Sequence, residues 1–242
     1  MYRVLSLFAG IGGFDLGLAR TGGFKTVAFC EIDPFCQRVL AKHWPGVPCY
    51  DDVRELTGEQ VGPVDVIVGG FPCQDISYAG PGEGLAGARS GLWREYARLI
   101  GELGPQLIIV ENVAALLARG MGEVLGTLSD LGFDAEWDTP TACGVGHPHV
   151  RRRVFLVAYS HRFNGRERLR DTLARAFRQI QTIDGLESAR AGSRAQLENP
   201  SGLYGGSDGL PNRMERNRAI GNAVVPQIPE LIGRAILQAE AA

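Results

Sequence analysis

Lysine is almost missing from this chain of 242 residues, in which only Lys25 and Lys42 are lysines. The other 23 of the 25 basic residues are arginine, the residue suited to bidentate contacts with phosphate and guanine. Two explanations fit this composition. Either the chain binds a nucleic acid, or it comes from a GC-rich genome, which would also make it rich in arginine, alanine and glycine.

Long apolar runs and closely spaced cysteines are missing as well. No apolar run approaches the length of a membrane span, and glycines follow residues 1–8 too soon for a signal peptide. We therefore expect a cytoplasmic protein with no membrane partner. The cysteines form no C-x-x-C pair, so neither a zinc site nor a disulfide framework is predicted, and no metal is expected. They are Cys30, Cys36, Cys49, Cys73 and Cys143.

The charge of the chain is close to balanced but unevenly distributed. A net charge of −2, with 45% hydrophobic and 21% charged residues, is ordinary for a soluble globular protein and argues weakly against wholesale nucleic-acid binding. Nine arginines nevertheless lie between residues 151 and 178, opposed only by Glu167 and Asp171. Such a basic strip is a possible nucleic-acid footprint.

The first part of the chain predicts an α/β fold with a nucleoside-binding edge. A strand over 3–8 leads into the glycine-rich turn of residues 9–13, a helix over 15–21 and a second strand over 24–30. Glu31 follows the second strand, about 20 positions after the first glycine, where a carboxylate can accept ribose hydroxyls. Capping of the next helix, over 35–43, is the alternative for Glu31 or Asp33, and it suits Asp33 better.

Cys73 is the candidate nucleophile. A β-branched strand over 64–68 is followed by two glycines and by Phe71-Pro72, which places the thiol on a rigid turn at the carboxyl end of a strand. A buried structural cysteine is the alternative. Residues 74–91 are rich in glycine and are predicted to form a mobile lid.

The second half offers candidate partners for this thiol. A helix over 92–103 and a strand over 106–110 precede Glu111, which is a candidate acid or base. A helix over 113–131, broken at Gly120 and Gly122, and a strand over 133–141 come next. Arg151 and Arg153 share one face at the start of a strand over 154–158. His147 and His149 lack a third ligand and are expected to have turn or hydrogen-bond roles.

Three regions are expected along the chain: an α/β domain over 1–158, a small irregular module over 159–215, and a segment over 216–242 that returns to the first domain. The middle region is polar, with one helix over 167–179 and little core of its own. A helix over 229–239 ends the last segment.

Read together, the motifs resemble those of the DNA (cytosine-5)-methyltransferases, in the order of that family and over nearly the whole chain. They are Phe8-Ala-Gly-Ile-Gly-Gly13, Glu31-Ile-Asp33, Asp52, Gly70-Phe-Pro-Cys-Gln74, Arg89-Ser-Gly-Leu92, Glu111-Asn-Val113, Arg151-Arg-Arg153 and Gly221-Asn-Ala-Val224. The resemblance makes 1–158 the catalytic domain and 159–215 the target-recognition region. That region is shortened to roughly 55 residues, below the usual size of an independent domain. His149 also departs from the family pattern, which has glutamine there.

The resemblance implies a Rossmann-like, S-adenosylmethionine-dependent methyltransferase sheet with helices on both faces. It implies catalytic roles for Pro72, Cys73, Gln74, Glu111, Arg151 and Arg153. It implies S-adenosylmethionine binding, with S-adenosylhomocysteine as product, by Phe8, Ala9, Gly10, Gly12, Gly13, Glu31, Ile32, Asp52, Val53, Gly70, Leu92, Asn222 and Val224. For Asp52, the residues alone leave an alternative open: its carboxylate could simply be solvated at the loop tip and bind no ligand.

The implied reaction is methylation of cytosine C5 in a base flipped out of duplex DNA, through a covalent bond between Cys73 and C6. A monomer from a bacterium or phage is expected, with a restriction endonuclease as a possible companion. A tRNA cytosine-5 methyltransferase is one alternative, although its Cys-Phe-Thr element is missing from the sequence. A catalytically silent DNA-binding relative is the other.

Overall fold

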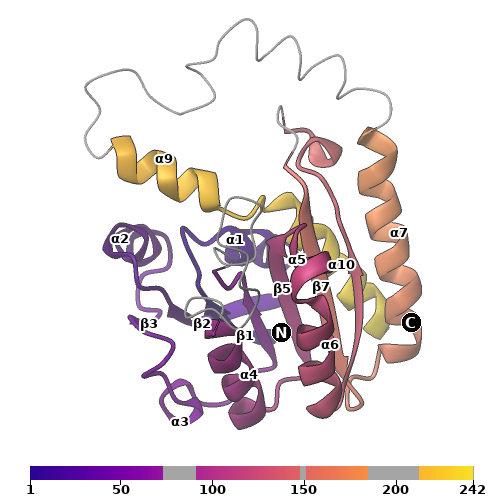
Figure 1. Cartoon of the computed structure of the whole chain (residues 1–242), viewed down its shortest axis with the longest axis horizontal. Coiled ribbons are helices and arrows are strands. Elements are labelled where there is room, and N and C mark those ends of the chain that lie inside the picture. Colours follow the sequence, from indigo (N-terminus) through magenta and orange to yellow (C-terminus); the bar gives the residue numbers. More distant parts are fainter. Residues whose placement is uncertain (73–90, 148–150, 185–212, 242) are drawn as a thin grey trace, which may run out of the picture.

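A seven-stranded sheet forms the centre of the computed structural model, which describes residues 1–72, 91–147, 151–184 and 213–241 (Figure 1). Its strands lie in the order β3-β2-β1-β4-β5-β7-β6. The strands are β1 Tyr2–Leu7, β2 Phe24–Cys30, β3 Cys49–Tyr50, β4 Val66–Gly69, β5 Leu107–Val113, β6 Phe133–Asp138 and β7 Arg153–Ser160. The strands β1 to β5 run parallel, and β7 is antiparallel to both β5 and β6.

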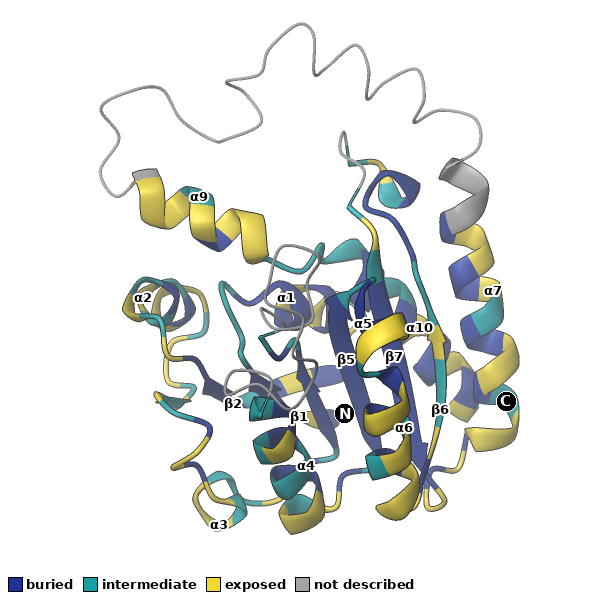
Figure 2. Cartoon of the chain, in the orientation of Figure 1, coloured by how far each residue is buried: buried dark blue, intermediate teal, exposed yellow. Residues whose placement is uncertain are grey.

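Helices cover both faces of this sheet, as the resemblance implied. The helical segments are α1 Gly13–Ala19, α2 Pro34–His43, α3 Gly58–Val61, α4 Leu92–Leu103, α5 Leu116–Arg119, α6 Met121–Asp130, η2 Cys143–Val145, α7 Arg166–Asp184, α9 Arg213–Asn222 and α10 Gln227–Ala241. The apolar residues of α4 and α6 pack on one face, whereas those of α1, α7 and α10 pack on the other. Figure 2 shows the strands as the buried layer between them.

Alternation along the strands divides the apolar residues between the two faces. In β1, Leu5 and Leu7 belong to the core beneath α4, and Val4 belongs to the core beneath α10. This is the period of two that a strand imposes on its side chains. The helix α4 was predicted with its observed bounds because apolar residues, among them Tyr96, Leu99 and Ile100, recur at helical spacing. These three side chains are buried.

The predicted recognition region contributes one helix to the core of the sheet. Leu169, Leu173 and Phe177 of α7 are buried in the same cluster as Ile232 and Ile236 of α10. The boundary expected at residue 158 therefore falls inside a continuous apolar core. Residues 185–212 lie outside the described part of the chain, so the recognition role of this region stays a prediction.

Several expectations need correction. Phe8 does not extend β1, because it adopts a left-handed conformation with φ 51°. The helix expected over 113–131 begins only at Leu116, because β5 continues to Val113. Its predicted break at Gly120 is confirmed between α5 and α6, whereas the break predicted at Gly122 is wrong, because this residue lies within α6. The helix α9 was not predicted. It is polar around its circumference and largely exposed, so its sequence carries no apolar period (Figure 2).

The parallel pairing of strands β1 to β5 ends at the same level across the sheet. Tyr50, Cys30, Leu7, Gly69 and Val110 are joined in register across five neighbouring strands. The residue that follows each of them must therefore lie along one edge of the sheet. This edge contains the point where the strand order reverses between β1 and β4, which is the usual ligand position in open α/β sheets.

Candidate functional site

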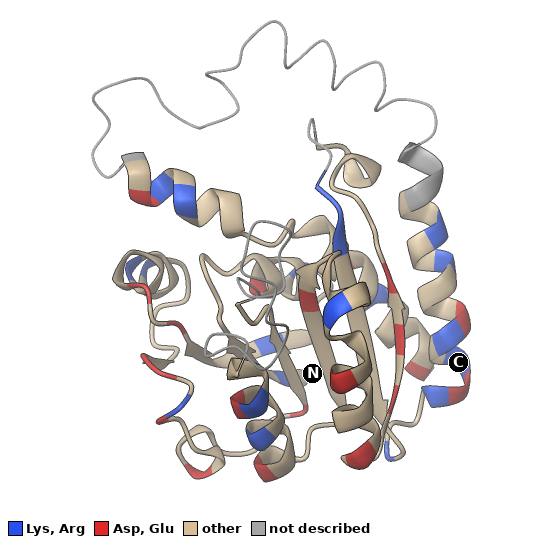
Figure 3. Cartoon of the chain, viewed as in Figure 1, with Lys and Arg blue, Asp and Glu red and all other residues tan. Residues whose placement is uncertain are grey.

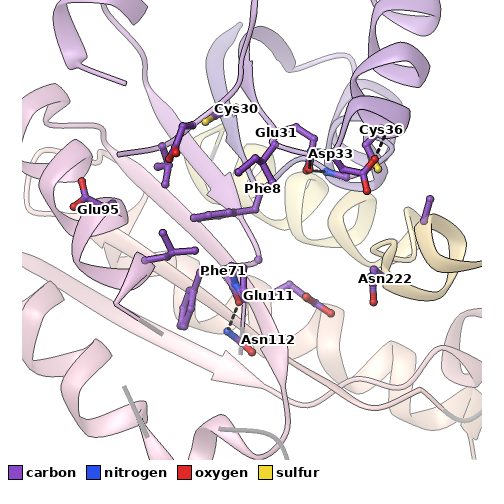
Figure 4. A pocket seen from close by; sticks show the side chains of 18 of the residues that line it. Phe8, Cys30, Glu31, Asp33, Cys36, Phe71, Glu95, Glu111, Asn112 and Asn222 are labelled. Atoms are coloured by element: carbon purple, nitrogen blue, oxygen red, sulfur yellow. Dashed lines mark hydrogen bonds between the residues drawn. The ribbon is translucent and has the colours of Figure 1, made fainter. Parts of the chain in front are cut away.

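A pocket of about 770 Å³ opens at this edge of the sheet (Figure 4). It brings together most of the site residues predicted from the sequence, namely Phe8, Gly10, Glu31, Ile32, Asp52, Val53, Gly70, Pro72, Leu92, Glu111, Arg151, Arg153 and Asn222. Four predicted residues do not line it: Ala9, Gly12, Gly13 and Val224. Cys73, Gln74 and the predicted lid up to residue 90 lie outside the described residues, as does His149.

The loop after β1 has an unusual backbone. Phe8, Gly10 and Gly12 have φ values of 51°, 55° and 83°, and Phe8 is the one non-glycine residue with positive φ among the described residues. Such strain in a non-glycine residue persists where the surroundings enforce it, and it is frequent in ligand-binding loops. Here the Phe8 ring stacks on Tyr96, with 6.4 Å between the ring centroids.

Gly13 and Val224 belong to a layer behind the pocket. A Cβ atom on Gly13 would collide with the backbone oxygen of Val224. Glycine is therefore needed for the C-terminal segment to approach the start of α1. These two residues can support the loop without touching a ligand.

Glu31 connects β2 to the glycine loop. The N–H of Gly10 donates to its Oε2 at 2.7 Å, and the N–H of Asp33 donates to its Oε1 at 2.8 Å. Asp33 has the other role considered from the sequence, because its Oδ1 accepts the N–H of Phe35 at 2.8 Å and caps α2. Glu31 is thus a buried carboxylate at the pocket wall, and it is not the cap.

Asp51 and Asp52, which follow β3, have different hydrogen-bond partners. The guanidinium of Arg54 hydrogen-bonds Asp52 and holds the pKa of that carboxyl below its usual value. Asp51 accepts a hydrogen bond from Nε2 of Gln37 at 3.0 Å. Asp52 and Val53 line the pocket next to Ile32, whose side chain is exposed.

Glu111 is the buried carboxylate at the other end of the pocket. Nε of Arg153 lies 3.1 Å from its Oε1. The geometry of this ion pair is not that of a hydrogen bond, so Oε1 is buried without a hydrogen-bond partner among the described residues. Burial raises the pKa of Glu111, and the charges of Arg153 and Arg151 oppose that rise.

The turn that leads to Cys73 is fixed by the neighbours of Glu111. Nδ2 of the buried Asn112 donates to the carbonyl oxygen of Phe71 at 3.2 Å (Figure 4). The Phe71 ring packs on Trp93. A Cβ atom on Gly70 would lie 2.9 Å from Oε2 of Glu111. Glycine at position 70 therefore leaves the room that this carboxylate occupies.

Arg151 and Arg218 reach the pocket from two segments that lie far apart in the sequence. Arg151 donates a hydrogen bond to the carbonyl oxygen of Gly221, which joins the start of β7 to the end of α9. On α9, Nη2 of Arg218 lies 3.3 Å from Oδ2 of Asp33. Figure 3 shows positive charge on both segments. Sequence reasoning missed Arg218, for which the only signal was its position three residues before the Gly221-Asn-Ala-Val224 motif.

His147 has the hydrogen-bond role expected of it, because its Nε2 lies 3.2 Å from Oε1 of Gln227. Within the described ranges, no group of three His, Cys, Asp or Glu residues is arranged to hold a metal ion. None of the helices described has both the length and the apolar composition that crossing a bilayer requires.

Comparison with known proteins identifies the family. The family described as C-5 cytosine-specific DNA methylase matches residues 2–198. The chain belongs to this family. The Type II methyltransferase M2.BsuMI of Bacillus subtilis is 40% identical over 164 residues, covering 64% of this chain and 41% of that protein. M.Bsp6I of a Bacillus species is 34% identical over 165 residues, covering 66% of this chain and 52% of that protein. The chain thus spans about half the length of these relatives.

Solved structures of methyltransferases share the fold. Entamoeba histolytica methyltransferase EhMeth aligns with a TM-score of 0.70 at 14% identity, covering 98% of both chains. A DNMT2 structure from Spodoptera frugiperda aligns with a TM-score of 0.58 at 20% identity, covering 68% of this chain and 51% of that one. These alignments support the Rossmann-like architecture predicted from the sequence.

Proposed function

We propose that this cytosine-5 methylase family member is an active DNA methyltransferase that modifies C5 of a cytosine flipped out of duplex DNA. The observation that carries the proposal is the Glu111 carboxylate, buried beside Arg153 and next to the Phe71-Pro72 turn that leads to Cys73. Duplex DNA is the proposed partner because the relatives are named Type II methyltransferases. A monomer in a bacterial cytoplasm, with a restriction endonuclease as companion, completes the proposal.

The pocket fits S-adenosylmethionine. Its volume of about 770 Å³ is in the range of small-molecule sites, and the buried Glu31 carboxylate lies where ribose hydroxyls can donate to it. Asp52 and Val53 would hold the adenine, and Phe8 and Gly10 would form the floor. The cofactor supplies an electrophilic methyl group on its sulfonium centre and leaves as S-adenosylhomocysteine.

The residues near Glu111 would activate the cytosine. C5 of cytosine is a weak nucleophile, so the Cys73 thiolate first forms a bond to C6. Glu111, protonated, holds N3 and N4 and supplies the proton that lets electron density build on the ring. Arg153 would contact O2, and Arg151 would support it. After methyl transfer the C5 proton leaves, and elimination of the thiol restores the ring.

None of these contacts can form inside a stacked duplex, so the base must be flipped out. The predicted lid over 74–91 would hold it in place. Target choice is assigned to the shortened recognition region.

The covalent step gives the sharpest test. A duplex with 5-fluorocytosine should trap the wild-type protein, because fluorine cannot leave C5 as a proton does, and the conjugate should survive denaturing electrophoresis. Cys73→Ala should bind S-adenosylhomocysteine normally and form no conjugate. Cys49→Ala is the matched control, because this thiol lies on β3, and it should be trapped like the wild type.

Two outcomes contradict the proposal: near-normal methyl transfer by Cys73→Ala, or DNA binding without trapping in the wild type. Transfer of labelled methyl groups to tRNA in preference to duplex DNA would point to the RNA-modifying alternative. No transfer to either nucleic acid would favour a silent relative.

A further inference from the structure

Arg218 is a charged side chain at the pocket that neither the motifs nor the proposed chemistry uses. It projects from α9, lines the pocket and forms an ion pair with Asp33 on α2. Asp33 uses its other oxygen to cap α2, so the ion pair holds the guanidinium beside the pocket. A guanidinium has five N–H donors, and one ion pair leaves donors for a ligand.

The other arginines on the pocket wall have different engagements. Arg153 pairs with Glu111, Arg151 donates to the Gly221 carbonyl, and Arg54 pairs with Asp52. Arg94 lies on α4, whereas Arg218 lies on α9. Arg218 is therefore the cation of the α9 wall.

The chemistry of the cofactor indicates what this wall must hold. A sulfonium centre has three substituents, which here are the adenosyl group, the methyl group and the amino-acid chain. Glu31 and Asp52 account for the adenosyl group at the β2–β3 side of the pocket. The methyl group must face Pro72 and Glu111 at the β4–β5 side. Two walls remain: α4, with Leu92, Arg94 and Glu95, and α9, with Arg218, Ala219 and Asn222. The α9 wall adjoins the ribose side, because Arg218 pairs with Asp33, whose N–H donates to Glu31.

We infer that Arg218 binds the α-carboxylate at the amino-acid end of S-adenosylmethionine. This inference rests on the proposed function and extends it to a residue on α9. A guanidinium–carboxylate pair can form two parallel hydrogen bonds, which makes the contact directional. The helix α9 is otherwise largely exposed. The contact would therefore also help to hold this helix against the pocket.

Binding of two cofactor fragments tests the inference without measuring activity. S-adenosylhomocysteine has the amino-acid end, whereas 5′-methylthioadenosine lacks it. In titration calorimetry, Arg218→Ala should weaken S-adenosylhomocysteine about tenfold, as expected for loss of a charge-assisted hydrogen bond. It should leave 5′-methylthioadenosine within about twofold of the wild type. Arg218→Lys should restore part of the lost affinity.

Arg216→Ala is the matched control, because Arg216 is exposed on the same helix and does not line the pocket. It should bind both ligands like the wild type. Equal weakening of both ligands in Arg218→Ala would show that the residue only positions α9, which overturns the inference. Unchanged binding of both also overturns it. A wild type that fails to bind S-adenosylhomocysteine would instead refute the proposed function, and the inference with it.

Discussion

Nε of Arg153 lies 3.1 Å from Oε1 of Glu111, across the antiparallel pairing of β5 and β7. In the ladder Arg153 stands opposite Val113, so it reaches Glu111 along the diagonal of the pair. Two opposing effects therefore set the proton affinity of this carboxyl group. Burial favours the neutral acid and the neighbouring arginines favour the carboxylate.

Arg153→Met should raise the pKa of Glu111 further, because it removes the larger of the two charges that oppose burial. If Glu111 acts as the protonated form, methyl transfer falls as pH rises through its pKa. The alkaline limb of the rate profile should then move to higher pH, while the maximal rate falls at least about tenfold through loss of the proposed contact to cytosine. Single-turnover transfer to a duplex, measured over a range of pH, provides the check.

Arg152→Met is the control for this experiment, because Arg152 is exposed and points to the opposite side of the strand from Arg153. Its profile should match that of the wild type. A limb that moves to lower pH in Arg153→Met would contradict the assignment of Glu111 as the acid.

Periodicity predicted the elements that bury an apolar face. The helix α4 appears with its expected bounds because its apolar residues repeat at helical spacing. The strand β2, which ends in a run of consecutive apolar residues, also has its expected bounds. The polar helix α9 could not be found in this way, since it buries only Ala219 among its described side chains. Arg218 was missed for the same reason.

Residue type and order predicted the members of the site, but not their pairings. Both Arg151 and Arg153 were expected on one face of a strand near Glu111. Which of them pairs with the carboxylate depends on the β5–β7 register, which no local pattern specifies. Asp33 rather than Glu31 was predicted to cap α2, and this could be predicted because capping geometry is local.

Gly70→Ala should reduce activity more than stability. Its new Cβ would lie 2.9 Å from Oε2 and 3.1 Å from the backbone oxygen of Glu111, so this carboxylate must shift. We expect methyl transfer to fall at least about tenfold, while the free energy of unfolding falls by about 1–2 kcal/mol. Gly122→Ala in α6 is the control, since nothing lies within 4 Å of its Cβ. Equal activities of the two variants would contradict this account of Gly70.

Asn112→Ala should loosen the turn before Cys73. The variant removes the donor to the carbonyl oxygen of Phe71, a buried group, and should lower the free energy of unfolding by about 1–3 kcal/mol. The rate of trapping by 5-fluorocytosine should fall as well, because the thiol is less well positioned. Asn217→Ala, on the exposed helix α9, should change neither quantity. A normal trapping rate in Asn112→Ala would separate this hydrogen bond from the positioning of Cys73.

Asp15 provides a pH-dependent prediction for the fold next to the glycine-rich loop of residues 9–13. Its carboxylate is 1% exposed and accepts hydrogen bonds from Oγ of Ser6 at 2.9 Å and from Oγ1 of Thr26 at 2.7 Å. Burial raises its pKa to about 6, although both hydroxyl groups oppose the rise. The folded protein therefore binds this proton more tightly than the unfolded chain does. The stabilisation is complete below pH 4 and is lost as pH rises through about 6.

Asp15→Asn should remove this dependence, because an amide keeps the shape of the side chain and does not titrate. Between about pH 4.5 and pH 7.5 the wild type should lose about 2 kcal/mol more unfolding free energy than the variant. Chemical denaturation at both pH values measures the difference. Asp171→Asn, at an exposed position on α7, should keep the wild-type dependence. A wild type whose stability changes with pH in parallel with that of Asp15→Asn would show that Asp15 stays in one protonation state over this range.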